Sequence, residues 1–138
     1  MKSSTTIRFT TALLFAITIA TSTVQAEIPW QRSPERTLQS ARQSGKPIVV
    51  FVTTQWCHYC QKMKKQTWSD GQVQATISRD FEPLMLDGDK DQQIVKQLGI
   101  RGYPATLVYD SHGSFLAMKS GFMTPEVATN WLSATRRR

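Results

Sequence analysis

The sequence predicts an α/β fold with a central mixed β-sheet flanked by helices on both faces. A continuous β-branched and aromatic run at 47–53 indicates a strand that is buried on both faces. Segments of helical composition separate this run from further strand-like segments, and such connections require parallel pairing. A tight turn at 110–113 joins two later strands directly, which requires antiparallel pairing. We therefore expect both kinds of pairing in one sheet.

The first elements lead to a pair of cysteines. A helix is expected to begin at Ser33-Pro34-Glu35, which supplies a capping hydroxyl, a proline at the first helical position and an acid in the first turn. Gly45 ends this helix, and the strand at 47–53 follows. The segment 60–66 has helix-forming composition without a breaker. Cys57 is therefore expected at a strand-to-helix turn, the end of a strand where open α/β sheets keep their sites.

The later elements follow from turn residues and apolar spacing. They are a short helix from Asp70-Gly71 to near Ile77, a strand at 81–87, a helix that Gly99 closes, strands at 105–109 and 114–118, and a last helix from Thr124.

The first 26 residues have the features of a signal peptide. Lys2 and Arg8 give a basic start, residues 12–20 are apolar, and Val24-Gln25-Ala26 matches a signal peptidase site. We expect cleavage after Ala26, one domain at 27–138 of about 112 residues, and a periplasmic or secreted location. An uncleaved membrane anchor is the alternative, but the apolar run is shorter than the roughly 20 residues needed to cross a bilayer.

The charge balance predicts no nucleic-acid partner. Removal of residues 1–26 takes the formal charge from +7 to +5, and three of these positive charges are the terminal Arg136-Arg137-Arg138. No basic face with interleaved aromatic residues accompanies this run, so we interpret it as a solvated terminus. A domain of this size can bury a core without disulfide staples, and we expect a monomer.

Cys57 and Cys60 are the only cysteines, and their spacing favours redox chemistry. A disulfide that closes so short a loop restricts the unfolded chain little, so it would contribute little as a structural staple. At the amino end of a helix, Cys57 would face free backbone N–H groups and the positive end of the helix dipole, which favour the thiolate. We expect Cys57 to be the nucleophile and Cys60, one turn further and more covered, to be the resolving thiol.

Two roles are open for each residue between the cysteines. An imidazolium at His58 would lower the thiol pKa and make the pair a stronger oxidant, whereas a side chain that points into solvent would have no effect. Tyr59 is either a surface aromatic or part of the rim that substrates touch.

Metal binding is the main chemical alternative. Structural zinc requires four ligands, but the chain has two cysteines and two histidines, and His112 lies in a distant turn. Gln61 follows Cys60, so the haem-attachment motif is absent. A copper(I) metallochaperone would bind the metal through the two thiols, and methionine sulfurs could be further ligands. Methionines at these spacings are, however, more often core residues. These methionines are Met63, Met85, Met118 and Met123. We expect no metal and no cofactor.

The chain resembles the thioredoxin superfamily, particularly its exported thioredoxin-like branch, over nearly all of 27–138. The specific part is Trp56-Cys57 with the second cysteine at Cys60, and Gly102-Tyr103-Pro104 lies before the strand and hairpin as in that family. Lys46-Pro47 and Gly121 are weaker supporting features. The resemblance implies a thioredoxin fold.

The resemblance also implies site residues around the cysteines. Pro104 is expected to be a cis proline that packs beside the pair, and Tyr103 is expected to offer backbone groups to an extended substrate. Trp56, His58 and Tyr59 complete the expected set of residues that bind substrate or tune the thiols.

Two features depart from the family. Thioredoxins have a buried acid beneath the resolving cysteine, but the matching positions here, Val50 or Phe51, are apolar. The proton of Cys60 would then travel through water or Glu82. The dipeptide His58-Tyr59 is neither the Gly-Pro of cytosolic thioredoxins nor the Pro-His of strong periplasmic oxidases, so it does not indicate the direction of electron flow.

We therefore expect an exported protein-disulfide oxidoreductase that reduces or exchanges disulfides of extracytoplasmic, cysteine-containing proteins through the Cys-His-Tyr-Cys pair. A membrane-bound or soluble thiol would supply its electrons. The resemblance favours a reductant. The alternatives are a disulfide oxidase or isomerase, the copper(I) metallochaperone, and a non-catalytic interaction domain that would keep its role after Cys57→Ser.

Overall fold

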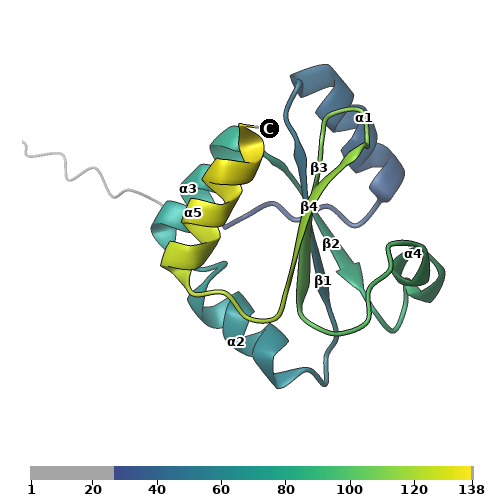
Figure 1. Cartoon of the computed structure of the whole chain (residues 1–138), viewed down its shortest axis with the longest axis vertical. Coiled ribbons are helices and arrows are strands. Elements are labelled where there is room, and N and C mark those ends of the chain that lie inside the picture. Colours follow the sequence, from purple (N-terminus) through teal and green to yellow (C-terminus); the bar gives the residue numbers. More distant parts are fainter. Residues whose placement is uncertain (1–26, 138) are drawn as a thin grey trace, which may run out of the picture.

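A four-stranded sheet with helices on both sides forms the centre of the molecule (Figure 1). The computed structural model describes residues 27–137. Its elements in chain order are α1 (Pro34–Ser44), β1 (Ile48–Thr53), α2 (His58–Gln66), α3 (Gly71–Asp80), β2 (Glu82–Asp87), α4 (Gln92–Gln97), β3 (Ala105–Tyr109), β4 (Phe115–Ser120) and α5 (Pro125–Arg136). The sequence prediction located every one of these elements, with small differences at their ends.

The strands are ordered β2-β1-β3-β4, and β1 is central. It is parallel to β2 and antiparallel to β3, and β3 and β4 form the expected antiparallel hairpin. All six residues of β1 are buried, as its apolar composition predicts. The mixed sheet is confirmed.

One pairing prediction is wrong. Strands separated by a helix were expected to be parallel, but β3 runs opposite to both β1 and β2 although α4 precedes it. The reason is the length of α4. Its six residues span about 9 Å at 1.5 Å per residue, whereas a six-residue strand spans about 20 Å. The chain therefore does not return along the sheet, and β3 starts at the same end of the strands as that at which β2 ends.

Two hydrophobic clusters fill the spaces on either side of the sheet. One side is covered by α2, α3 and α5, which pack on Val49 and Phe51 of β1, and the other is covered by α1 and α4, which pack on Val50 and Val52 (Figure 1). Successive β1 side chains thus enter opposite clusters, as the alternation of a strand requires.

The predicted helix starts are confirmed by their caps. The side chains of Ser33, Asp70 and Thr124 accept hydrogen bonds from the first-turn N–H groups of α1, α3 and α5. Gly45 ends α1 in the left-handed conformation, with φ of 72°, which glycine adopts without a steric penalty.

The predicted signal peptide, residues 1–26, lies outside the described residues. Within 27–137, no helix has the length and apolar character needed to cross a membrane.

Candidate redox site

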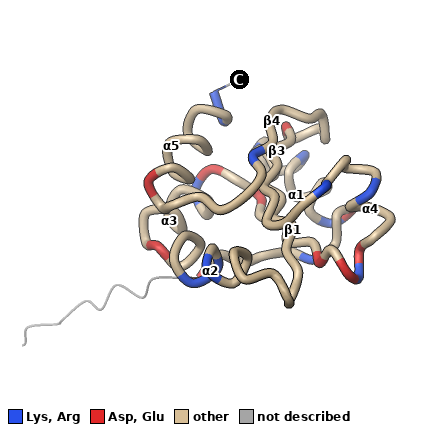
Figure 2. The backbone as a smooth tube through the Cα atoms, turned by 60° about the horizontal axis from the view of Figure 1, so that its bottom comes forward, with Lys and Arg blue, Asp and Glu red and all other residues tan. Residues whose placement is uncertain are grey.

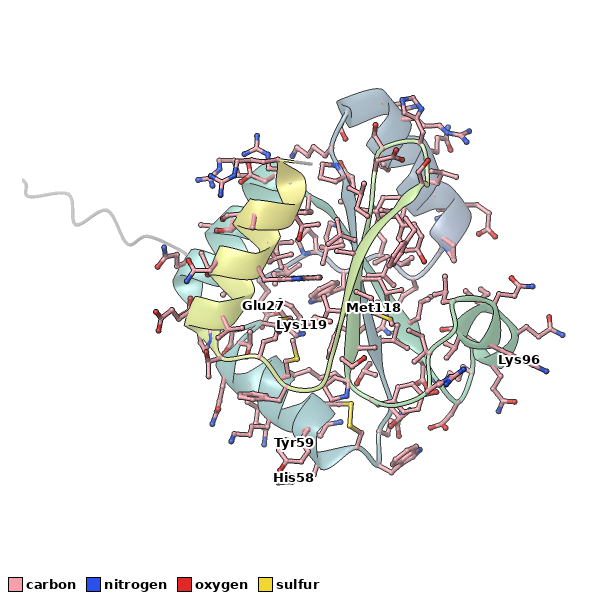
Figure 3. The ribbon with its side chains drawn as sticks, viewed as in Figure 1. Glu27, His58, Tyr59, Lys96, Met118 and Lys119 are labelled. Carbon is pink, nitrogen blue, oxygen red and sulfur yellow. A yellow bond between two sulfur atoms is a disulfide. The ribbon has the colours of Figure 1, made fainter. Side chains whose placement is uncertain are left out.

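The two cysteines form a disulfide at the amino end of α2, directly after the loop that follows β1 (Figure 3). Cys57 is the N-cap residue, and its Sγ accepts a hydrogen bond of 3.1 Å from the backbone N–H of Cys60. Cys57 is 7% exposed and Cys60 is fully buried. The strand-to-helix position of Cys57 and the deeper burial of Cys60 are as the sequence predicts.

Trp56 and Tyr103 lie against each other beside this turn. Their ring centroids are 5.9 Å apart at an interplanar angle of 82°, an edge-to-face contact. The indole Nε1 of Trp56 donates to both carboxylate oxygens of Asp89, at 3.2 and 3.1 Å, while 70% of Trp56 stays exposed. Two predicted site residues are therefore in contact, and Asp89 holds one of them.

Gly88 lets the Tyr103 ring approach the backbone after β2. A Cβ atom at position 88 would lie 2.4 Å from Tyr103 Cζ and Oη, closer than real Cβ contacts allow. Sequence reasoning missed both Gly88 and Asp89, because Gly88-Asp89 has the composition of an ordinary turn and its partners are distant in sequence. The one available signal was the position of this glycine-acid pair, directly after the strand that neighbours β1.

His58 and Tyr59 occupy the exposed first turn of α2, at the lower end of the molecule in Figure 3. Their ring centroids are 5.7 Å apart, and 58% of Tyr59 is exposed. The structure thus places both residues beside Cys57 in the chain, with their rings on the outer surface.

The Tyr103–Pro104 peptide bond is cis, as the resemblance implies. Pro104 is buried, and its carbonyl accepts a hydrogen bond of 2.8 Å from the N–H of Gly121. This bond ties the segment before β3 to the residue that follows β4.

The predicted proton route through Glu82 is wrong. Glu82 begins β2 and is paired with Ile48, at the opposite end of β1 from the cysteines. Its carboxylate accepts hydrogen bonds from Ser44 and Gln31 at that end. The β1 residues that match the family's buried acid, Val50 and Phe51, are buried and apolar, and Phe51 is the one that packs on the α2 side of the sheet. Sequence reasoning also missed Lys64, a half-buried lysine one helical turn after Cys60.

The metal alternatives gain no support from the geometry. His112 lies in the β3–β4 turn, next to the end of β3 that pairs with the start of β1, so it is remote from the cysteines. Met63, Met85 and Met123 lie in the core cluster beneath α2, α3 and α5. Within residues 27–137, no three His, Cys, Asp or Glu side chains gather closely enough to hold a metal ion.

A family model for thioredoxin-like domains matches residues 34–136, from the start of α1 to the end of α5. The chain belongs to the thioredoxin-like domain family. The resemblance inferred from Trp56-Cys57, Cys60 and Gly102-Tyr103-Pro104 is thereby confirmed.

The thioredoxin-like domain is also similar to parts of larger curated proteins named thiol:disulfide interchange protein DsbD. It is 26% identical over 107 residues to the protein of Ralstonia nicotianae, and the match covers 75% of this chain and 17% of that protein. It is 28% identical over 120 residues to the protein of Escherichia coli K12, with coverage of 78% and 21%. The chain thus spans about a fifth of the length of these relatives.

Solved structures share the fold of this thioredoxin-like domain. A DsbH oxidoreductase superposes with a TM-score of 0.69 at 20% identity, over 81% of this chain and 86% of the other. The reduced C-terminal domain of Neisseria meningitidis DsbD superposes with a TM-score of 0.61 at 22% identity, over 76% and 99%. The predicted thioredoxin fold is confirmed.

Proposed function

We propose that this domain is an exported thiol–disulfide oxidoreductase whose reactive groups are Cys57 and Cys60. One observation carries the proposal: a disulfide joins an N-cap cysteine that is 7% exposed to a fully buried cysteine one turn later. When the bond is reduced, a thiolate at Cys57 would keep the N–H of Cys60 as a donor and the helix dipole as a favourable field.

The reaction would proceed by two exchanges. The Cys57 thiolate attacks one sulfur of a client disulfide, forms a mixed disulfide and releases the other client sulfur as a thiolate. The Cys60 sulfur, after losing its proton, attacks Cys57 Sγ and releases the second client thiolate. Two electrons have then passed to the client, and the domain is left with its Cys57–Cys60 disulfide. An external dithiol would then reduce the Cys57–Cys60 disulfide by the same exchange chemistry.

The surrounding residues would bind the client. An extended client segment would lie along Tyr103 and Pro104, with Tyr103 supplying backbone groups, and the exposed Trp56 would cover it from the side. Trp56 is suited to this because its ring is already held by Asp89 and Tyr103. His58 and Tyr59 would form the outer rim.

We favour a reductant of cysteine-containing extracytoplasmic proteins, supplied with electrons by a membrane-bound or soluble thiol. The name of the DsbD relatives supports disulfide interchange. A reduction potential near −270 mV, about that of thioredoxin, would support the reducing direction, and about −120 mV would contradict it. Amino-terminal sequencing of the exported protein, with Glu27 as its expected first residue, tests the cleavage and the domain boundary.

A trapping experiment tests the proposed chemistry. Cys60→Ala removes the resolving thiol, so Cys57 should stay joined to client proteins in mixed disulfides that a reductant releases. The wild-type protein should also accelerate the reduction of insulin by dithiothreitol. Cys57→Ala is the matched control, because it keeps one thiol in the same turn but places it at the buried position. Equal capture by both variants, or none by Cys60→Ala, would contradict the assignment.

A further inference from the structure

Lys64 lies on the inward face of the helix that carries the cysteines. It shares this face with Cys60, Met63 and Thr67, all of which are fully buried. Lys65, the next residue, is exposed, whereas Lys64 is half-buried. The helix α2 contains basic residues and no acid, as Figure 2 shows by its blue segments. Lys62 is half-buried too, but its ammonium group lies over the Phe122 ring, 4.8 Å from the ring centroid. Lys64 is therefore the half-buried lysine of α2 on the face of Cys60.

Helix geometry favours a Lys64 side chain that leans toward the amino end of α2, where the redox turn lies. Residues four apart on a helix have Cβ atoms about 5–6 Å apart, and helical side chains lean toward the amino end. Lys64 borders a cavity of about 380 Å³ whose wall includes Thr54 and Gln55, the residues just before Trp56 and Cys57. The cavity thus reaches from the lysine to the base of the redox turn.

The charged groups around Lys64 come from two neighbouring segments, the one before α1 and the one at the end of β2. Arg32, Lys90, Asp87 and Asp91 line the same cavity, and Glu27 lines a second cavity of about 200 Å³ that Lys64 also borders. Burial lowers the pKa of Lys64, Arg32 acts in the same direction, and Asp87 opposes them.

None of these acids forms an ion pair with Lys64. The Asp87 carboxylate accepts the N–H of Asp89, and the Asp91 carboxylate accepts the N–H of Asp87. In the described part of the chain, both ion pairs within 4.0 Å belong to Asp80. The ammonium group of Lys64 thus has a partial desolvation cost and no close carboxylate to offset it.

Opening of the disulfide would supply the missing anion. Reduction adds two electrons, which break the bond between Cys57 and Cys60 and leave two sulfur anions. Uptake of one proton gives one thiol and one thiolate, and uptake of a second gives the neutral dithiol. A cation at Lys64 attracts the thiolate form and interacts much less with the neutral disulfide. Its effect therefore differs between the two redox states.

We propose that Lys64 is a positioning residue that stabilises the thiolate form of the reduced Cys57–Cys60 pair and thereby raises the reduction potential of the domain. This inference rests on the proposed redox function of the pair. It also fits the absence of an acid on β1, because Phe51, the residue of β1 that Val50 precedes and that packs on the α2 side of the sheet, is apolar.

Titration of the reduced domain tests this role without any client protein. Lys64→Met removes the charge but keeps an unbranched apolar stem, Lys64→Arg keeps the charge, and Lys65→Met removes an exposed charge one residue away. Thiolate absorbance is recorded against pH in the intact pair and with Cys57→Ser, which leaves Cys60 alone. The pair is treated as a coupled dithiol with apparent pKa values.

We expect Lys64→Met to raise the apparent thiol pKa by about one unit, a tenfold change in the acid dissociation constant. The reduction potential, measured against glutathione, should fall by up to about 30 mV, the equivalent of a tenfold change in the equilibrium constant. Lys64→Arg should restore both values, and Lys65→Met should leave them near those of the wild type. Unchanged values in Lys64→Met, or equal shifts in Lys65→Met, would overturn the proposal.

The two proposals fail separately. A shifted thiol pKa in Lys64→Met together with no reduction of insulin by the wild type would refute the proposed function and keep the role of Lys64. Normal insulin reduction by the wild type, together with an unshifted thiol pKa in Lys64→Met, would refute the role of Lys64 and keep the proposed function. Thermal unfolding checks that each variant is folded, and Lys64→Gln replaces Lys64→Met if the latter is not.

Discussion

The lack of a side chain at Gly88 makes room for the Tyr103 ring in the candidate client-binding surface. This ring occupies the space that a Cβ at position 88 would need, and its edge meets Trp56. Trp56 in turn is held by Asp89. The glycine and the acid after β2 therefore fix two aromatic rings that come from other segments of the chain.

Gly88→Ala should disturb client binding more than folding. The added methyl group would push the outer end of the Tyr103 ring away, at a cost of about 1 kcal/mol, the low end for overpacking, because a ring end can move. We expect a higher KM for protein clients and a changed Trp56 fluorescence, with little change in the reaction with a small disulfide such as oxidised dithiothreitol. Ser111→Ala, in the turn between β3 and β4 and therefore remote from the cysteines, is the control.

The same residues show why part of the site was not predictable. Cys57, Cys60 and Pro104 follow from spacing and resemblance, which are local properties of the sequence. The Trp56–Asp89 bond joins residues 33 positions apart, and its formation depends on β2 ending beside β1. Lys64 was visible in the sequence as a lysine four positions after Cys60, but its burial was not. Nothing local in the sequence distinguishes Lys64, which is half-buried, from the next residue, Lys65, which is exposed.

At the level of elements, Asp80 joins α3 to α5. Its buried carboxylate accepts Arg79 at 2.8 Å and meets Arg136, in the last turn of α5, at 3.0 Å. The hydrogen bond from Arg79 is the main cause that lowers the pKa of Asp80, burial opposes it, and Arg136 lowers the pKa further. The ionised form is therefore favoured by folding.

Asp80→Asn should lose stability in a pH-dependent way. A pKa lowered by folding contributes stability that is complete above the unfolded value of about 3.9 and disappears as pH falls through the folded value. Because both arginines are largely exposed, we expect a loss of only about 1 kcal/mol at pH 7. Urea unfolding at a series of pH values should show the difference from wild type shrinking below about pH 4. A difference that is constant with pH would contradict the ionic origin.

The directions of the strands show the limit of sequence reasoning at this scale. The strand β1 and the caps at Ser33, Asp70 and Thr124 were predictable because composition and local hydrogen bonds determine them. The antiparallel pairing of β1 with β3 was not, because it depends on how far α4 carries the chain. A six-residue helix is too short for the return path that the prediction assumed.

In the whole molecule, β1 joins the two hydrophobic clusters into one structural unit. Val49 and Phe51 belong to one cluster and Val50 and Val52 to the other, and all four are at most 3% exposed. Loss of either cluster would expose one face of the central strand. We therefore expect the described domain to unfold in a single cooperative transition.

Tryptophan fluorescence and far-ultraviolet circular dichroism test this expectation. Trp30 and Trp68 belong to or pack on the cluster beneath α2, α3 and α5, so fluorescence reports mainly on that side. Circular dichroism reports on all helices and strands. The two unfolding curves in urea should coincide. A fluorescence midpoint clearly separated from the dichroism midpoint would mean that the clusters unfold independently.

The short α4 has a practical consequence for anyone who wishes to attach this protein to something else. Because β2 ends and β3 starts at the end of the sheet where Cys57 follows β1, the disulfide and the surrounding loops lie together at one end of the molecule, or pole. The last turn of α5 lies at the other pole, where Arg136 meets Asp80 just before β2 begins (Figure 1). A fluorescent reporter, a bead or an electrode joined through that end would point the sulfur pair outward, so the domain is well arranged for an immobilised redox probe.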